Sequence, residues 1–204
     1  MKKSTRIGLI LAIILVAALA ALAEWLVIRE DDITKNPSGL ITSVKMGGAF
    51  NLIDHKGNAV TEKNFLGNYV LVFFGYTFCP DACPTALADV ALVLDELGRD
   101  SLAVTPIMIT IDPERDTPDV LSEYITLFHD RIIGLTGTEN QIKDVAEKYR
   151  VFYRRVDDQE YSFYLMDHTS FIYLVDPKGS VISLFRYGTS PSEIADEIRK
   201  HMKG

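Results

Sequence analysis

The chain has 204 residues, of which 48% are hydrophobic and 24% are charged, and these values are ordinary for a globular protein and exclude a disordered chain. Its net charge of −7 argues against a nucleic-acid binder, which needs a basic surface to displace the counterions of phosphate groups. Its 2 cysteines are too few for a disulfide-stapled mini-protein or a four-cysteine zinc module.

The N-terminal segment predicts a membrane anchor. Residues 7–28 are apolar apart from Glu24 and are long enough to cross a hydrocarbon core of about 30 Å as a helix. Basic residues precede this span and acidic residues follow it, so the positive-inside rule leaves residues 1–6 in the cytoplasm. The alternative is a cleavable signal peptide, because Ala21-Leu22-Ala23 has the A-x-A form of a cleavage site. The apolar run is longer than an ordinary signal-peptide core, which favours the uncleaved anchor.

This orientation sends the rest of the chain across the membrane. The N-terminus lacks the length and the Arg and Ser content of a mitochondrial presequence. We therefore expect a single-pass protein of a bacterial inner membrane with its domain in the periplasm, rather than a mitochondrial protein that faces the intermembrane space. Residues 29–48 are rich in turn-forming residues and are predicted to be a linker, and residues 49–204 are predicted to fold. In such a compartment two close cysteines can form a disulfide bond.

The folded part alternates predicted strands and helices. Phe50 to Ile53 and the residues from Val60 flank a polar turn and predict a β-hairpin, and Tyr69 to Gly75 is typical of a central strand buried on both faces. The remaining predicted elements are a helix at 85–97, a strand at 103–111, a helix at 119–130, a strand at 132–135, a helix at 140–149, strands at 151–156 and 161–166, a hairpin within 170–187 and a helix at 191–202 capped by Ser190. This order predicts an α/β domain of the thioredoxin-like type, in which helices flank a central mixed sheet.

Cys79 and Cys83 follow the central strand, where the chain turns into a helix. In open α/β sheets, functional sites collect beyond the carboxyl ends of the strands. If the first helical turn includes both cysteines, they share one helix face, and both sulfurs would then point at one guest atom. The three-residue gap differs from the C-x-x-C of thioredoxin-like reductants and suits two thiolates that hold a soft metal, although it also permits a disulfide. A purely structural disulfide is the remaining alternative.

A third ligand for such a metal would come from elsewhere in the chain. Soft thiolate ligands select Cu(I) most readily, with zinc as the common competitor. Among the 4 histidines, His55 lies in a hairpin turn, His129 near the end of a predicted helix and His201 in the last turn of the terminal helix, and each has an ordinary structural explanation. His168 stands just before a predicted buried strand. The residues alone leave open whether His168 is a ligand or a structural histidine.

Three blocks of the sequence resemble the signature of the Sco/SenC family of cytochrome c oxidase assembly proteins. The first runs from Gly75 to Pro84 and contains the cysteine pair. The second is IDPERDTP at residues 111–118, and the third is Asp167-His168-Thr169, followed by the DPKG turn at 176–179. The likeness covers roughly residues 49–202 in the expected order, and a membrane span ahead of the domain also matches.

The resemblance implies a membrane-anchored metallochaperone with a thioredoxin-like fold. Such a protein binds one copper ion per chain, as Cu(I) or Cu(II), and helps to load the dinuclear CuA centre in subunit II of cytochrome c oxidase. A copper donor or a thiol reductant would be a further partner. The copper ligands that the resemblance implies are Cys79, Cys83 and His168.

Further residues are candidates for groups around these ligands. Asp167 is a candidate outer-shell group or fourth ligand that would orient the imidazole, with a cap or turn acid as the alternative. Asp112 ends a buried strand on the side of the cysteines, and it is expected either to face the site or to accept from the loop backbone. Tyr76 and Phe78 are expected to shield the metal from water or to form a partner surface.

The sequence leaves other functions to be weighed. A thiol–disulfide oxidoreductase would use Cys79 and Cys83 to reduce the cysteines of oxidase subunit II or of another exported protein, and it would need no histidine. A thiol peroxidase would require proline and threonine at the positions of Val72 and Tyr76, which argues against it. No sequence feature separates a redox or copper sensor from a chaperone.

Arg115 is expected to have a structural role, pairing with the adjacent Asp116, with docking to a partner as the alternative.

Overall fold

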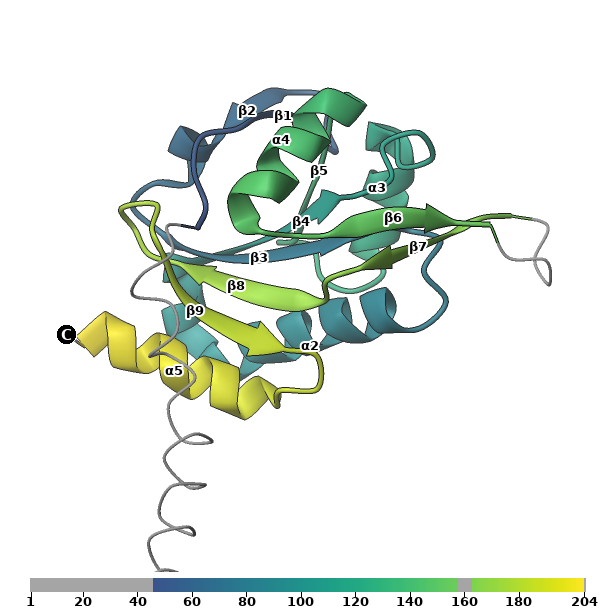
Figure 1. Ribbon diagram of the computed structural model, residues 1–204. Helices are drawn as coiled ribbons and strands as arrows, with labels where there is room; N and C mark the ends of the chain where they lie inside the picture. The colour runs from purple at the N-terminus through teal and green to yellow at the C-terminus, as the bar shows by residue number, and fades with distance from the viewer. Residues whose placement is uncertain (1–45, 158–162, 204) are drawn as a thin grey trace, which may run out of the picture. The chain divides into compact units, whose positions relative to one another are not determined.

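A mixed β-sheet lies at the centre of the computed structural model, which describes residues 46–157 and 163–203 (Figure 1). Within these residues the sheet has seven strands in the order β2-β1-β5-β4-β3-β8-β9. Their bounds are β1 Asn51–Asp54, β2 Ala59–Thr61, β3 Tyr69–Gly75, β4 Val104–Thr110, β5 Ile133–Thr136, β8 Phe171–Val175 and β9 Val181–Arg186. Strands β3, β4 and β5 run parallel, and the other pairings are antiparallel.

The sheet brings two loops together at one edge. The residues of β3 from Val70 to Gly75 are all buried, as expected for an apolar strand that is covered on both faces. β4 lies beside it in parallel register, with Thr110 opposite Gly75. Because the carboxyl ends of these strands meet, the loop that carries Cys79 and the loop that carries Asp112 leave the sheet side by side.

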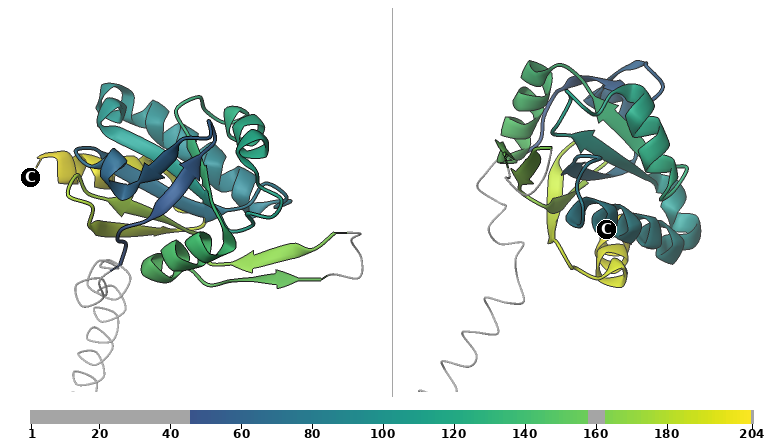
Figure 2. Two further views of the ribbon diagram at one scale, coloured as in Figure 1. Left: turned by 90° about the horizontal axis from the view of Figure 1, so that it is seen from above. Right: turned by 90° about the vertical axis from the view of Figure 1, so that its right-hand side faces the viewer.

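Helices cover both faces of the sheet. α2 (Ala82–Leu97) and α5 (Pro191–Lys203) pack side by side against one face, and α4 (Glu139–Tyr149) lies against the other (Figures 1 and 2). α3 (Pro118–Thr126) packs on β5. The 3-10 helices η2 (Glu62–Phe65) and η3 (Gly98–Ala103) lie in connections between these elements.

A capping box fixes the start of α5. The hydroxyl of Ser190 accepts a hydrogen bond from the backbone N–H of Glu193, and the Glu193 carboxylate accepts one from the backbone N–H of Ser190. The N-cap predicted at Ser190 is therefore confirmed.

A second, two-stranded sheet projects from the main one. β6 (Tyr153–Val156) and β7 (Leu165–His168) pair antiparallel, with Tyr153 opposite His168. Figure 2 shows this hairpin extending beyond the body of the domain. Because His168 is the last residue of β7, it lies at the end of the hairpin that leads into β8.

Most of the predicted elements are present, and three of them differ by three residues or more at one boundary. α2 begins at Ala82 rather than at residue 85, which brings Cys83 into its first turn. α3 ends at Thr126 rather than at residue 130, because the chain tightens into turns at Leu127 and Phe128. The strand predicted at 161–166 is β7, which lies further along the chain and includes His168 because that residue pairs with β6.

The predictions for the N-terminal part mostly lie outside the described residues. These are the cytoplasmic segment at 1–6, the anchor at 7–28 and most of the linker at 29–48. Across the ranges that the structure describes, no helix combines the length and the apolar character needed to cross a membrane. At the end of the predicted linker, the backbone N–H of Gly47 donates to the carbonyl of Lys148 at 2.9 Å and ties the chain to α4.

Candidate metal centre

The two cysteines lie at the junction of β3 and α2. Cys79 is partly exposed in the loop, and Cys83 is fully buried in the first turn of the helix. Both are free thiols. The backbone N–H of Cys83 donates to the sulfur of Cys79 at 3.4 Å, so this sulfur satisfies one of the unpaired N–H groups at the start of α2.

The two sulfurs have different acidities. A hydrogen bond from the Cys83 thiol lowers the pKa of Cys79 to about 3, with a smaller contribution from His168 and in opposition to partial burial. The same bond, together with burial, raises the pKa of Cys83. The pair therefore presents a partly exposed thiolate at Cys79 and a buried thiol at Cys83, and a thiolate is the form that ligates a metal or attacks a disulfide.

His168 reaches this pair from the distant hairpin. Its Nε2 lies 3.6 Å from the sulfur of Cys83, and its Nδ1 lies 3.1 Å from the carbonyl oxygen of Thr169. A carbonyl only accepts, so Nδ1 donates to it, and this hydrogen bond orients the ring with Nε2 toward the sulfur. The rings of Tyr76 and Phe73 pack edge-on against the imidazole, with centroids at 6.0 and 6.3 Å.

A buried carboxylate anchors the cysteine loop. Asp116 is fully buried and accepts from the backbone N–H of Thr77 at 3.1 Å and from the hydroxyls of Thr77 and Thr110. Burial raises the pKa of this carboxyl. The pairing of Arg115 with Asp116 that the sequence suggested is therefore wrong, because Asp116 turns inward to the threonines and the Arg115 guanidinium pairs with Asp112.

Asp116 is a site residue that the sequence reasoning missed. Thr77 and Thr110 carry its hydroxyl partners, and they stand at the ends of the neighbouring parallel strands β3 and β4. A polar residue at each of two adjoining strand ends is the signal from which a shared buried partner could have been inferred.

Gly75 is a second missed residue, because it allows the close approach of Cys83. A Cβ atom at this position would lie 3.0 Å from the Cys83 sulfur and 2.5 Å from Cε1 of Phe73. Both contacts are shorter than packed side chains tolerate. The last residue of β3 is thus kept without a side chain where the buried thiol packs.

The comparisons with known proteins decide the family. The family model described as SCO1/SenC matches residues 39–203. The chain belongs to the SCO1/SenC family. The SCO2-like protein of Rickettsia conorii is 40% identical over 202 residues, which cover 97% of this chain and 98% of that protein.

Solved structures of Sco proteins share the fold. ScoI of Arabidopsis thaliana, solved with copper bound, is 38% identical with a TM-score of 0.74, and the match covers 78% of this chain and 98% of that one. ScoI of Bradyrhizobium japonicum, also solved with copper bound, is 41% identical with a TM-score of 0.71, over 76% of this chain and 98% of that one. The predicted thioredoxin-like fold is confirmed by this likeness.

The donor set of this Sco chain fits a soft metal. Two cysteine sulfurs and an imidazole nitrogen are ligands that Cu(I) prefers, with zinc as the competitor. The 3.6 Å between the Cys83 sulfur and Nε2 of His168 is close to the roughly 3.5 Å expected between a sulfur and a nitrogen bound tetrahedrally to one ion at ordinary bond lengths. Among residues 46–157 and 163–203, no three side chains of His, Cys, Asp or Glu already form a complete metal-binding group.

Tyr76, Asp112 and Asp167, which were predicted to surround the ligands, have different surroundings in the structure. Tyr76 is buried against His168, and its hydroxyl accepts from the backbone N–H of Met166. Asp112 is buried and accepts hydrogen bonds from Arg115 and from the hydroxyl of Tyr164. Asp167 is exposed and pairs with Arg154 at 2.7 Å, on the face of β7 opposite to His168. Of the three, only Tyr76 contacts a predicted ligand in the described residues.

The remaining predicted residues have contacts of other kinds. Phe78 is half exposed, and its ring packs edge-on against that of Phe163. Nδ1 of His55 accepts from the backbone of Gly134, Nδ1 of His129 accepts from that of Arg131, and His201 pairs with Glu197 on α5. His55 and His201 lie in the hairpin turn and the terminal helix as expected, whereas His129 lies beyond the end of α3 rather than at the end of a helix.

Proposed function

We propose that this protein is a copper metallochaperone that binds one copper ion per chain, as Cu(I) or Cu(II), through Cys79, Cys83 and His168. The observation that carries the proposal is the 3.6 Å approach of Nε2 of His168 to the sulfur of Cys83. The histidine comes from a strand 85 residues further along the chain, and thiol–disulfide exchange has no need of it. The Sco family comprises copper-binding proteins that act in cytochrome c oxidase assembly, which supports the same function.

Copper is the cargo of this protein in our proposal, and the site suits its release. A metal that is to be passed on must be held by few ligands and must be reachable by the ligands of the acceptor. Cys79 is partly exposed, whereas Cys83 is buried beneath it. We infer that the acceptor's ligands enter on the Cys79 side and that Cys83 is the last sulfur to release the ion.

The groups around the ligands have separate roles in the proposal. Tyr76 packs edge-on against His168 and excludes water from that side of the imidazole. Asp112 acts from a distance, because its carboxylate is occupied by Arg115 and Tyr164. Asp167 stays a prediction as an outer-shell group, since its carboxylate is paired with Arg154.

We further propose the CuA centre in subunit II of cytochrome c oxidase as the destination of the copper. The resemblance of the three sequence blocks to the Sco/SenC signature supports it. The apolar segment at residues 7–28 supports a location at a bacterial inner membrane, with the domain in the periplasm beside the oxidase. Resistance of the full-length protein to alkaline extraction from membranes, and its loss on deletion of residues 7–28, would test the anchor.

One observation favours a thiol–disulfide oxidoreductase as the second candidate. The Cys79 thiolate is partly exposed and the Cys83 thiol lies directly behind it. Attack of Cys79 on a partner's disulfide would form a mixed disulfide and release one partner thiolate. Attack by Cys83 would then release the second partner thiolate and leave a Cys79–Cys83 disulfide. Such a reaction would not depend on His168.

A transfer experiment tests the proposal against this alternative. The reduced full-length protein is loaded anaerobically with one equivalent of Cu(I) and mixed with the metal-free, reduced CuA domain of oxidase subunit II. We expect copper to move to the acceptor from the wild type, and Cys79→Ser to transfer far less. In parallel, the metal-free reduced protein is mixed with the acceptor in its disulfide form. Equal reduction by wild type and His168→Ala, together with no copper transfer, would establish the oxidoreductase instead.

A further inference from the structure

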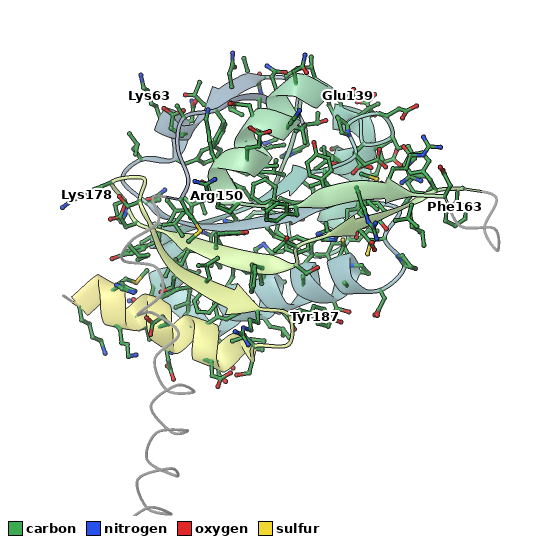
Figure 3. All side chains as sticks on the ribbon, in the orientation of Figure 1. Lys63, Glu139, Arg150, Phe163, Lys178 and Tyr187 are labelled. Carbon is green, nitrogen blue, oxygen red and sulfur yellow. The ribbon has the colours of Figure 1, made fainter. Side chains whose placement is uncertain are left out.

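The position of His168 depends on a hairpin that is not part of the central sheet. β6 and β7 pair only with each other within the described residues. Phe163, labelled in Figure 3, lies toward the outer end of this hairpin, whereas His168 lies at its inner end. Side chains that hold β7 against the body of the domain therefore determine where the imidazole stands.

Tyr164, the residue just before β7, attaches the hairpin to the body of the domain. Its carbonyl oxygen accepts from Nη1 of Arg115 at 2.9 Å, and its hydroxyl donates to Asp112 at 2.8 Å. The carbon at the centre of the Arg115 guanidinium lies 3.7 Å from the centroid of the Tyr164 ring. Two residues along, the backbone N–H of Met166 donates to the hydroxyl of Tyr76 at 3.2 Å. Residues at every second position of an extended chain share a face, so the side chain of Tyr164 is on the same face as that of His168.

Arg115 is itself fixed to the cysteine side of the site. Its Nε pairs with the buried carboxylate of Asp112, and its guanidinium also lies 4.6 Å from the centroid of the Phe78 ring, next to Cys79 in the chain. Nη2 is buried and has no hydrogen-bond acceptor among the described residues. The guanidinium also lies over the rings of Tyr164 and Phe78, and the compact ammonium of a lysine could not reproduce these contacts together with the hydrogen bonds of Nε and Nη1.

We propose that Arg115 is a positioning residue for His168. Its guanidinium clamps Tyr164 to the loop that follows β4, and the clamp keeps β7 where Nε2 of His168 meets the sulfur of Cys83. The cysteines have further attachments of their own, through Asp116 and the start of α2. This inference deepens the proposed function and rests on it only for the part that concerns copper.

The clamp is tested first without metal, in the full-length protein. In Arg115→Lys we expect the amide of Met166 to exchange its hydrogen at least about tenfold faster, because local opening of β7 controls its protection. We also expect the imidazole resonances of His168 to shift toward those of a solvent-exposed ring. Exchange in β3 should stay unchanged. Arg154→Lys is the matched control, since Arg154 lies on the same hairpin but on its solvent face.

A double-mutant cycle of Cu(I) affinity tests whether Arg115 acts through His168. Arg115→Lys should weaken Cu(I) binding about tenfold in the presence of His168 and leave it unchanged in a His168→Ala background. Equal losses in both backgrounds would overturn the positioning role, because they would mean that Arg115 acts through the fold or through the cysteines. If the wild type binds no copper, the proposed function fails. The metal-free exchange experiment still shows whether Arg115 holds β7 in place.

A second variant covers the possibility that Arg115→Lys does not fold. Tyr164→Phe keeps the stacked ring and removes only the hydroxyl that donates to Asp112. We expect a smaller acceleration of Met166 exchange than in Arg115→Lys, with exchange in β3 unchanged. The inference would be overturned if both folded variants kept the wild-type exchange rate at Met166 and the wild-type resonances of His168. If Arg115→Lys unfolds, the same result in Tyr164→Phe alone would overturn it.

Discussion

The carboxylate of Asp116 accepts hydrogen bonds from both the backbone N–H and the hydroxyl of Thr77, two residues before Cys79. Thr110 at the end of β4 donates a third hydrogen bond to the same carboxylate. One buried side chain thus joins the ends of two parallel strands and fixes the loop that delivers the first sulfur. The cysteine pair owes its position to this loop as much as to helix α2.

Replacing Asp116 by Ala should destabilise the domain by about 1–3 kcal/mol. The substitution leaves the backbone N–H of Thr77 and two hydroxyls without their acceptor in a buried place. Urea unfolding measures the change, with Glu123→Ala on the exposed side of α3 as the control. A loss under about 0.5 kcal/mol, which is typical of surface positions, would contradict the role of Asp116.

The pH dependence of stability gives a second test of Asp116. Burial raises the pKa of this carboxyl above its ordinary value of 3.8, so the folded state binds the proton more tightly than the unfolded state. Its contribution is therefore fully present below about 3.8 and is lost as the pH rises through the folded pKa. The free energy of unfolding of wild type minus that of Asp116→Asn should fall as the pH is raised above about 4. A difference that stays flat or rises would refute the raised pKa.

The two thiols should differ in reactivity. Cys79 is partly exposed and Cys83 is fully buried, so iodoacetamide should alkylate Cys79 at least about tenfold faster in the reduced, metal-free protein. Mass spectrometry of peptides after timed quenching measures both rates. Protein unfolded in urea is the control, in which the rates should become similar. Faster reaction of Cys83 in the folded protein would mean that the order of the two sulfurs is the reverse of the one described.

Asp167→Asn separates two interpretations of the acid next to His168. The sequence makes Asp167 a candidate for a ligand or an outer-shell group, whereas the structure pairs it with Arg154 on the exposed face of β7. Exposed ion pairs contribute little, and we expect copper affinity to change by less than about twofold. Competition with a Cu(I) chelator measures it, with Asp157→Asn on the same hairpin as the control. A tenfold loss specific to Asp167→Asn would restore the sequence interpretation.

The sequence was sufficient to predict most strands of the sheet and the place of the cysteine pair after the central strand. The apolar run from Tyr69 to Gly75 coincides with β3, and the hairpin near Asp54 and the terminal hairpin are present, because local patterns specify these elements. The shared helix face expected for the cysteines is absent, because α2 begins at Ala82 and Cys79 lies in the loop before it. The sulfur of Cys79 instead accepts from the backbone N–H of Cys83 at the start of the helix.

The sequence was not sufficient for interactions that depend on distant pairing. β6 and β7 form their own sheet, and nothing local indicates that Tyr153 lies opposite His168. Arg115 was expected to pair with its neighbour Asp116, but consecutive side chains diverge, and its partners are Asp112 and the carbonyl of Tyr164, 49 residues away. His168 itself was identified only through the family resemblance.

Anaerobic titration of the reduced full-length protein with Cu(I) tests the central claim most directly, as wild type and as His168→Ala. His201→Ala, which alters a histidine at the end of α5, is the control. The proposed function predicts one tightly bound copper per chain in the wild type and in the control, with affinity reduced at least about tenfold in His168→Ala. Equal copper binding by His168→Ala, or zinc that displaces the copper from the wild type, would contradict the metal site and leave Cys79 and Cys83 as a redox pair.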